Sequence, residues 1–151
     1  MTIEELRTLH NGKTFSMLIG IDVGVKTGFA IYDTKSKSFS KIQTLKIHDA
    51  MDIVKKEFAI NGQSLKVYFE DARQRKWFGN SGREKLQGAG SVKRDSSIWE
   101  DFLTSLNIQF EMIPPKRNAT KLSDSVFAKL TGYKGRTSEH GRDAAMLVFG
   151  K

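Results

Sequence analysis

The chain has 151 residues, contains no cysteine and carries a net charge of +8 at pH 7. Its length suits one domain with a substantial core rather than two, and the lack of cysteine excludes disulfides and thiolate-bound metals. No apolar run approaches the roughly 20 residues of a membrane-spanning helix, and residues 1–16 lack the apolar segment of a secretory signal. We therefore expect a cytoplasmic protein whose basic charge favours a polyanionic partner.

The predicted elements begin with a short helix over residues 2–10, where Thr2 and Glu5 form a capping-box pattern. We interpret residues 1–16 as an N-terminal extension and residues 17–151 as a single domain. Within that domain the patterns predict strands at 17–23, 28–33 and 39–47, a helix at 48–59, a strand at 64–70, a helix at 83–106, a strand at 108–113, and helices at 119–131 and 139–149. This order indicates an α/β domain with a mixed five-stranded sheet, in which an antiparallel meander is joined by parallel strands.

Two of these helices have a predicted apolar face. In the helix at 83–106 the face consists of Ile98, Phe102, Leu103 and Leu106. In the helix at 119–131 the residues expected to point inward are Leu122, Val126, Phe127 and Leu130.

The first predicted strand contains an unexpected carboxylate. Asp22 lies in an apolar run, where burying its charge costs on the order of several kcal/mol unless a cation or hydrogen bonds compensate. An Asp-x-Gly triplet is often only a turn cap, but Asp22 precedes the turn, so we interpret it as a metal ligand. Gly24 and Gly28 are interpreted as allowing a sharp turn and the close approach of a phosphate.

Three further candidate ligands follow Asp22 along the chain. Glu70 ends the fourth strand, and alternation weakly favours it over its neighbour Asp71. His140 and Asp143 open the last helix, where a spacing of three places them on one face; taken alone they would be cap or dipole groups. The combination predicts a Mg²⁺ or Mn²⁺ site, with two ions stabilising the attacking water and the leaving oxygen of a phosphodiester. His140 could instead orient or deprotonate the water.

Basic residues gather on both sides of these acids, which favours a nucleic-acid-binding surface over a merely solvated one. The two clusters are Arg73, Arg75, Lys76, Arg83, Lys85, Lys93 and Arg94, and Lys116, Arg117, Lys121, Lys129, Lys134 and Arg136. Trp77 and Phe78 lie in the first cluster, and in so polar a loop we interpret them as stacking on bases rather than as core residues.

At the level of motifs the chain resembles the RuvC family of Holliday-junction resolvases, within the RNase H-like superfamily. The resemblance rests on Ile19–Gly24 with Thr27 and Gly28, on Val67–Glu70, on the small residues Gly88–Ser91, and on the His-x-x-Asp-Ala-Ala segment at 140–145. It implies an RNase H-like fold, a homodimer, and Mg²⁺- or Mn²⁺-dependent paired nicking of four-way DNA junctions. A phage or other mobile-element member, acting in a bacterial or phage-infected cell, is expected.

The resemblance also implies roles for single residues. By motif, Asp22, Glu70, His140 and Asp143 would be the catalytic, metal-binding set. Lys121, expected at the start of a helix, would be the lysine near the scissile phosphate, and Lys116 would be a second basic position. Arg73 stands near the place where the family has an aromatic wedge, so the DNA-contacting set becomes Arg73, Arg75, Lys76, Trp77, Phe78, Arg83, Lys116, Arg117 and Lys121.

Three other functions fit parts of the pattern. The Asp-x-Gly-x-x-x-Gly segment also resembles the phosphate loop of actin-like ATPases and sugar kinases, but these need two domains around the nucleotide, so no nucleotide cofactor is expected. A YqgF-like member of the RNase H folds, acting on RNA, would share the first motif. A protein that binds branched DNA without cutting it would share the basic clusters.

Overall fold

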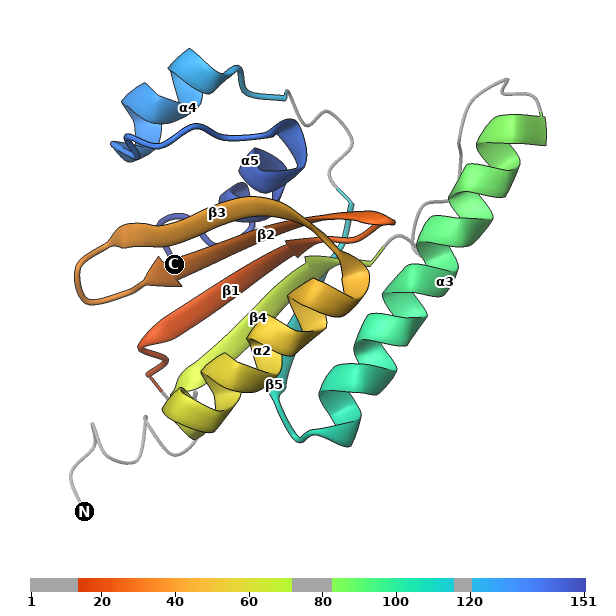
Figure 1. The fold of residues 1–151 in the computed structure, drawn as a ribbon, viewed down its shortest axis with the longest axis horizontal. Helices are drawn as coiled ribbons and strands as arrows, with labels where there is room; N and C mark the ends of the chain where they lie inside the picture. The colour runs from red at the N-terminus through yellow and green to blue at the C-terminus, as the bar shows by residue number, and fades with distance from the viewer. Residues whose placement is uncertain (1–13, 72–82, 116–120) are drawn as a thin grey trace.

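The computed structural model describes residues 14–71, 83–115 and 121–151, which form a five-stranded sheet flanked by helices (Figure 1). The strands are β1 (Met17–Asp22), β2 (Lys26–Asp33), β3 (Ser38–Lys46), β4 (Leu65–Glu70) and β5 (Gln109–Ile113). The helices are α2 (Ile47–Asn61), α3 (Arg83–Ser105), α4 (Asp124–Thr131) and α5 (Glu139–Met146), with a 3₁₀ turn at Gly62–Ser64. The predicted helix at 2–10 lies outside the described residues.

The sheet has the strand order β3-β2-β1-β4-β5. β1 pairs antiparallel with β2 and parallel with β4, β2 pairs antiparallel with β3, and β4 pairs parallel with β5. An antiparallel meander therefore continues into a parallel half, which is the mixed α/β, RNase H-like arrangement predicted from the sequence.

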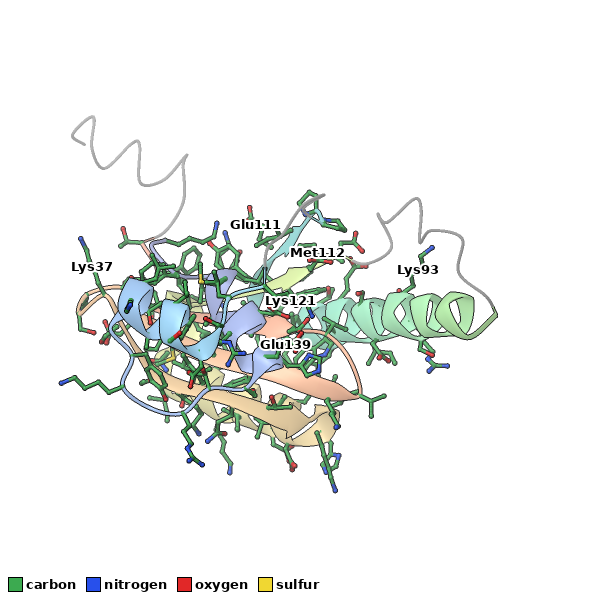
Figure 2. The ribbon with its side chains drawn as sticks, turned by 90° about the horizontal axis from the view of Figure 1, so that it is seen from above. Lys37, Lys93, Glu111, Met112, Lys121 and Glu139 are labelled. Atoms are coloured by element: carbon green, nitrogen blue, oxygen red, sulfur yellow. The ribbon has the colours of Figure 1, made fainter. Side chains whose placement is uncertain are left out.

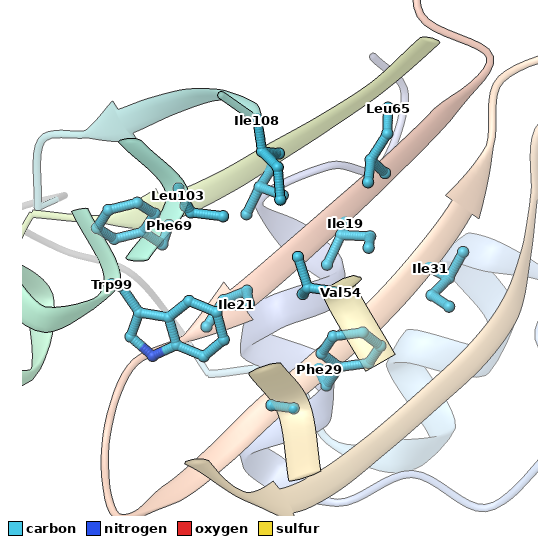
Figure 3. Packing of buried hydrophobic residues seen from close by; sticks show 12 residues of the cluster. Ile19, Ile21, Phe29, Ile31, Val54, Leu65, Phe69, Trp99, Leu103 and Ile108 are labelled. Carbon is cyan, nitrogen blue, oxygen red and sulfur yellow. The ribbon is translucent and has the colours of Figure 1, made fainter. Parts of the chain in front are cut away.

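The two faces of the sheet bury separate apolar clusters because side chains alternate along each strand. Ile19, Ile21 and Phe29 point to the face covered by α2 and α3, where Trp99 is also fully buried (Figure 3). Leu18 and Ala30 point to the other face, covered by α4 and α5. In Figure 1, α2 crosses the front of the sheet and α5 lies behind it. Even-numbered positions of β1, Asp22 included, thus belong to the α5 face.

The inner face of α3 differs from the prediction. Trp99 and Leu103, four residues apart, are fully buried, whereas Ile98 is 44% exposed. Because successive helix positions are about 100° apart, burying Trp99 turns Ile98 toward solvent. The large indole had more apolar surface to bury, and the apolar spacing alone did not reveal this rotation.

The α4 helix starts later than predicted. It begins at Asp124, and Ser123 caps it by accepting a hydrogen bond from the Val126 N–H at 3.3 Å. Phe127 is buried, but Val126 is 50% and Leu130 51% exposed, so the expectation that both point inward was wrong. The short helix places only one large apolar side chain fully in the core.

None of the helices in the described part of the chain is long and apolar enough to span a membrane.

Candidate metal centre

Asp22 is the last residue of β1 and lies opposite Gly28 in the antiparallel register with β2. A Cβ placed on Gly28 would overlap the carbonyl oxygen of His140 and lie 2.8 Å from the Cβ of Asp22. The absent side chain is therefore what allows the first turn of α5 to rest on the strand. Gly20 has the same role for the next turn of α5, since a Cβ on Gly20 would overlap the carbonyl oxygen of Ala144.

These contacts correct the interpretation of the glycine pair. The space above Gly28 is filled by the backbone of α5 and is not left open for a phosphate. Neither Gly24 nor Gly28 adopts a positive φ angle, so the turn does not demand glycine for its backbone conformation. The turn is instead closed by Thr27, whose buried hydroxyl donates a hydrogen bond to the Gly24 carbonyl at 2.8 Å.

The start of α5 is fixed to the sheet by its cap. Ser138 accepts a hydrogen bond from the Gly141 N–H at 3.1 Å, and its hydroxyl is also hydrogen-bonded to the hydroxyl of Thr44 on β3. Gly141 packs closely against the side chain of Ile42. The Ser138 cap thus starts α5 and sets its position over β2 and β3. In this position His140 and Asp143 point toward β1.

Asp22, His140 and Asp143 meet at this place. The Nδ1 atom of His140 lies 2.8 Å from Oδ2 of Asp22, and one possible ligand atom from each of the three residues lies within 4.8 Å of the others. All three side chains are partly buried. Two carboxylates and an imidazole at this spacing form a donor set that fits a divalent cation such as Mg²⁺ or Mn²⁺.

The electrostatics of the site favour an added positive charge. Burial raises the pKa of Asp22 above its ordinary value of 3.8, and the Asp143 and Glu70 carboxylates raise it further, while the hydrogen bond from His140 opposes the rise. Burial also raises the pKa of Asp143, with Lys121 acting in the opposite direction. A divalent cation would offset the repulsion among these carboxylates.

Glu70 ends β4 beside this group. Its side chain is not one of the three whose ligand atoms lie within 4.8 Å, but its charge is close enough to raise the pKa of Asp22. Alternation along β4 places Lys66, Tyr68 and Glu70 on the α5 face. Asp71 is 7% exposed, and its backbone N–H donates to the carbonyl of Ile113 at 2.9 Å. Glu70 and Asp71 are both candidate ligands. Glu70 is favoured because it lies on the α5 face and its charge acts on Asp22.

Lys121 reaches the site from the segment before α4 and not, as expected, from within that helix. Its ammonium group forms an ion pair with the Glu139 carboxylate and lies 3.8 Å from Oδ2 of Asp143 (Figure 2). The hydrogen bond to Glu139 raises the pKa of Lys121, so the amine is a cation at neutral pH. Glu139 was not predicted as a site residue, although its place directly before His140 in the first turn of α5 was a usable signal.

Most of the predicted DNA-contacting residues lie outside the described residues, and they stay predictions. They are Arg73, Arg75, Lys76, Trp77, Phe78, Lys116 and Arg117. The same holds for the side chain of Arg83, the first residue of α3.

Comparison with known proteins finds likenesses among solved structures but none in sequence. No protein-family profile matches the chain, and no curated protein matches its sequence. Among solved structures the chain is similar to one described as the crystal structure of Fowlpox virus resolvase and substrate Holliday junction DNA complex. The two are 13% identical, the match covers 87% of this chain and 97% of that chain, and the TM-score is 0.45.

Proposed function

We propose that this protein is a divalent-metal-dependent endonuclease that cuts four-way and other branched DNA. The observation that carries the proposal is the meeting of Asp22, His140 and Asp143, from segments more than 110 residues apart, at the end of the central strand. The RuvC-like motifs contain these same residues, and four-way DNA is the substrate that this resemblance implies. The net charge of +8 suits a polyanionic substrate.

In this proposal Asp22, Asp143 and Glu70 hold Mg²⁺ or Mn²⁺, with two ions expected. When bound, the ions supply charge stabilisation for the attacking water and the leaving oxygen. The protein contributes the carboxylates, the orientation of the His140 imidazole by Asp22, and the cation of Lys121 beside Asp143. Lys121 would attract the phosphate group next to the site.

His140 has two candidate roles that share one geometry. An ionised Asp22 accepts a hydrogen bond from Nδ1–H, which leaves Nε2 as the basic ring nitrogen. Nε2 can then coordinate a cation or take a proton from water. In both roles Asp22 fixes the orientation of the imidazole.

Paired nicking of a four-way junction needs two sites related by a two-fold axis, so we propose a homodimer. Several large apolar side chains of the described residues are exposed, and some of them lie on α3 and α4, the two helices that are candidate dimer surfaces. These are Ile98 on α3 and the pair Val126 and Leu130 on α4, which are four residues apart on one helix face.

The experiment that tests the proposal is a cleavage assay on synthetic four-way junctions with Mg²⁺ or Mn²⁺, with a linear duplex of the same sequence as the substrate control. Asp22→Asn is the matched variant because it keeps the side-chain shape and removes the charge. We expect the wild-type protein to nick the junction, and both Asp22→Asn and Glu70→Gln to bind it without cutting.

The other outcomes of this assay identify the alternatives. Preferential cleavage of RNA by the wild-type protein would point to the YqgF-like function. Binding of the junction without cleavage under any metal condition would identify a branched-DNA-binding protein. Either result would contradict the proposed nuclease.

A further inference from the structure

Two lysines face each other at the open end of the meander. In the antiparallel register of β2 and β3, Lys26 is the direct partner of Lys46, and both side chains are exposed. Opposed residues in such a pair have Cβ atoms about 5 Å apart, and like charges there destabilise the sheet. Among the residues that the structure describes, no carboxylate forms an ion pair with either ammonium group.

Lys46 is also unfavourable for the helix that it precedes. It is the N-cap residue of α2 and makes no side-chain capping hydrogen bond. A positive charge at a helix N-terminus opposes the helix dipole, and serine, threonine, asparagine or aspartate would cap better. Folding of the protein therefore gains nothing from a cation at this position, in the strand pair or in the helix.

The pair borders the metal centre. Side chains two residues apart on a strand point to the same face, so Lys26 shares the face of Gly28, and Lys46 shares the face of Thr44. Gly28 is covered by the backbone of His140, and the hydroxyl of Thr44 bonds the cap of α5. Both lysines therefore flank the start of α5, about 7 Å along the sheet from the residues that support His140.

We propose that Lys26 and Lys46 form a phosphate-binding pair that holds the DNA backbone next to the cleaved phosphodiester. This inference rests on the proposed nuclease function and adds a second cationic contact, on the sheet side, to that of Lys121. A phosphate between the two ammonium groups would relieve their mutual repulsion on binding. Because the contact is made to phosphate, it carries no base preference and depends strongly on salt.

The test compares Lys26→Gln and Lys46→Gln with the control Lys56→Gln. Lys56 is exposed on α2, which packs on the opposite face of the sheet, so this control removes the same charge away from the centre. Junction binding is measured against salt concentration in the Asp22→Asn background, which prevents cleavage. We expect each variant of the pair to weaken binding about three- to tenfold and to lower the logarithmic salt slope by about 1, with little change for the control.

A second variant separates binding from folding. Lys46→Ser removes the charge and supplies a helix cap, so it should weaken junction binding while raising the thermal midpoint by about 2–4 °C. A stability gain together with weaker binding supports the pair, because a structural lysine would show the opposite change in stability.

The failures of the two proposals are distinguishable. If the protein cuts junctions but the pair variants bind with the affinity and salt slope of Lys56→Gln, the phosphate-binding pair is overturned and the nuclease stands. If the pair variants lower the slope but the wild-type protein cuts nothing, the nuclease is overturned, and the pair stands as a phosphate contact of a DNA-binding protein. Absence of DNA binding by the wild-type protein overturns both.

Discussion

The hydrogen bond between His140 Nδ1 and Asp22 Oδ2 joins two residues that are 118 positions apart in the chain. It orients the imidazole, and it ties the last helix to the end of the central strand. Asp22 is at the same time held in an environment that disfavours its charge, since burial is the largest cause of its raised pKa. A bound cation would therefore stabilise the ionised form of the Asp22 carboxylate.

Metal binding should therefore stabilise the fold through these residues. At a free Mn²⁺ concentration 100 times the dissociation constant, we expect about 2.7 kcal/mol of added stability for the wild-type protein. Asp22→Asn should show little of this gain because one ligand charge is lost. Thermal unfolding with and without Mn²⁺ measures the difference. If Mn²⁺ raised the thermal midpoint equally for the wild-type protein and Asp22→Asn, the ion would bind at another site.

The pH dependence of the metal-free protein follows from the same raised pKa. Between pH 3.8 and the higher folded-state pKa of Asp22, the folded state binds more protons than the unfolded state. The free energy of unfolding contributed by Asp22 therefore falls as pH rises through this window. Asp22→Asn should remove that fall. Urea denaturation in EDTA across this pH range measures the free energy of unfolding of the wild-type protein and of Asp22→Asn. Identical pH profiles for the two proteins would show that the pKa of Asp22 is not raised by folding.

The packing of α5 on the sheet depends on positions without side chains. Gly20 and Gly28 allow the helix backbone to rest on β1 and β2, and Ala144 and Ala145 complete the contact as small buried residues. The placement of His140 and Asp143 over Asp22 is a consequence of this close approach. A wider separation of helix and sheet would move the two side chains away from the strand.

Gly28→Ala should separate the helix from the strand. Its methyl group would overlap the His140 carbonyl, so we expect a loss of about 1–3 kcal/mol of stability and a marked loss of cleavage. The control is Gly90→Ala on α3, where an added Cβ meets nothing within 4 Å and should stabilise the helix by about 0.5–1 kcal/mol. Chemical denaturation compares the two. Wild-type stability and activity for Gly28→Ala would refute this packing account.

Much of this arrangement could be predicted from the sequence. The apolar run around Asp22 and the alternation before Glu70 predicted the two central strands. The spacing of His140 and Asp143 predicted that they share one helix face. These are local patterns, which a sequence displays directly. The strand at 65–70 and the helix at 83–105 were also recovered to within a residue at each end.

What could not be predicted depends on contacts between distant segments. The role of Gly28 appears only when α5 is laid on β2, and the ion pair of Lys121 with Glu139 only when two segments meet. The pairing of Lys26 with Lys46 requires the strand register. The burial of Trp99 in place of Ile98 requires the rotation of α3 about its axis, which its neighbours in the core decide.

The molecule as a whole combines a strongly basic charge with a small acidic centre. In the proposed function, such a charge distribution would attract DNA at long range while the carboxylates recruit the cation. The paired nicking that we propose would further require two copies, and the exposed apolar positions on α3 and α4 are candidate contacts.

We expect the protein to sediment as a dimer at the concentrations at which it cuts junctions. Ile98→Lys on α3 and Leu130→Lys on α4 separate the two candidate surfaces, because a charge at the correct one should shift the protein to monomer and abolish paired nicking. Sedimentation velocity measures the oligomeric state. A wild-type protein that makes paired nicks as a monomer would contradict the dimer.

We expect Asp22, His140 and Asp143, with Glu70 beside them, to enclose a divalent cation. Anomalous diffraction from a crystal of the protein soaked in Mn²⁺ locates such an ion directly. We expect an anomalous peak between the carboxylates of Asp22 and Asp143, and no peak there in crystals of Asp22→Asn. A crystal with these side chains in place and no ion between them at saturating Mn²⁺ would contradict this expectation.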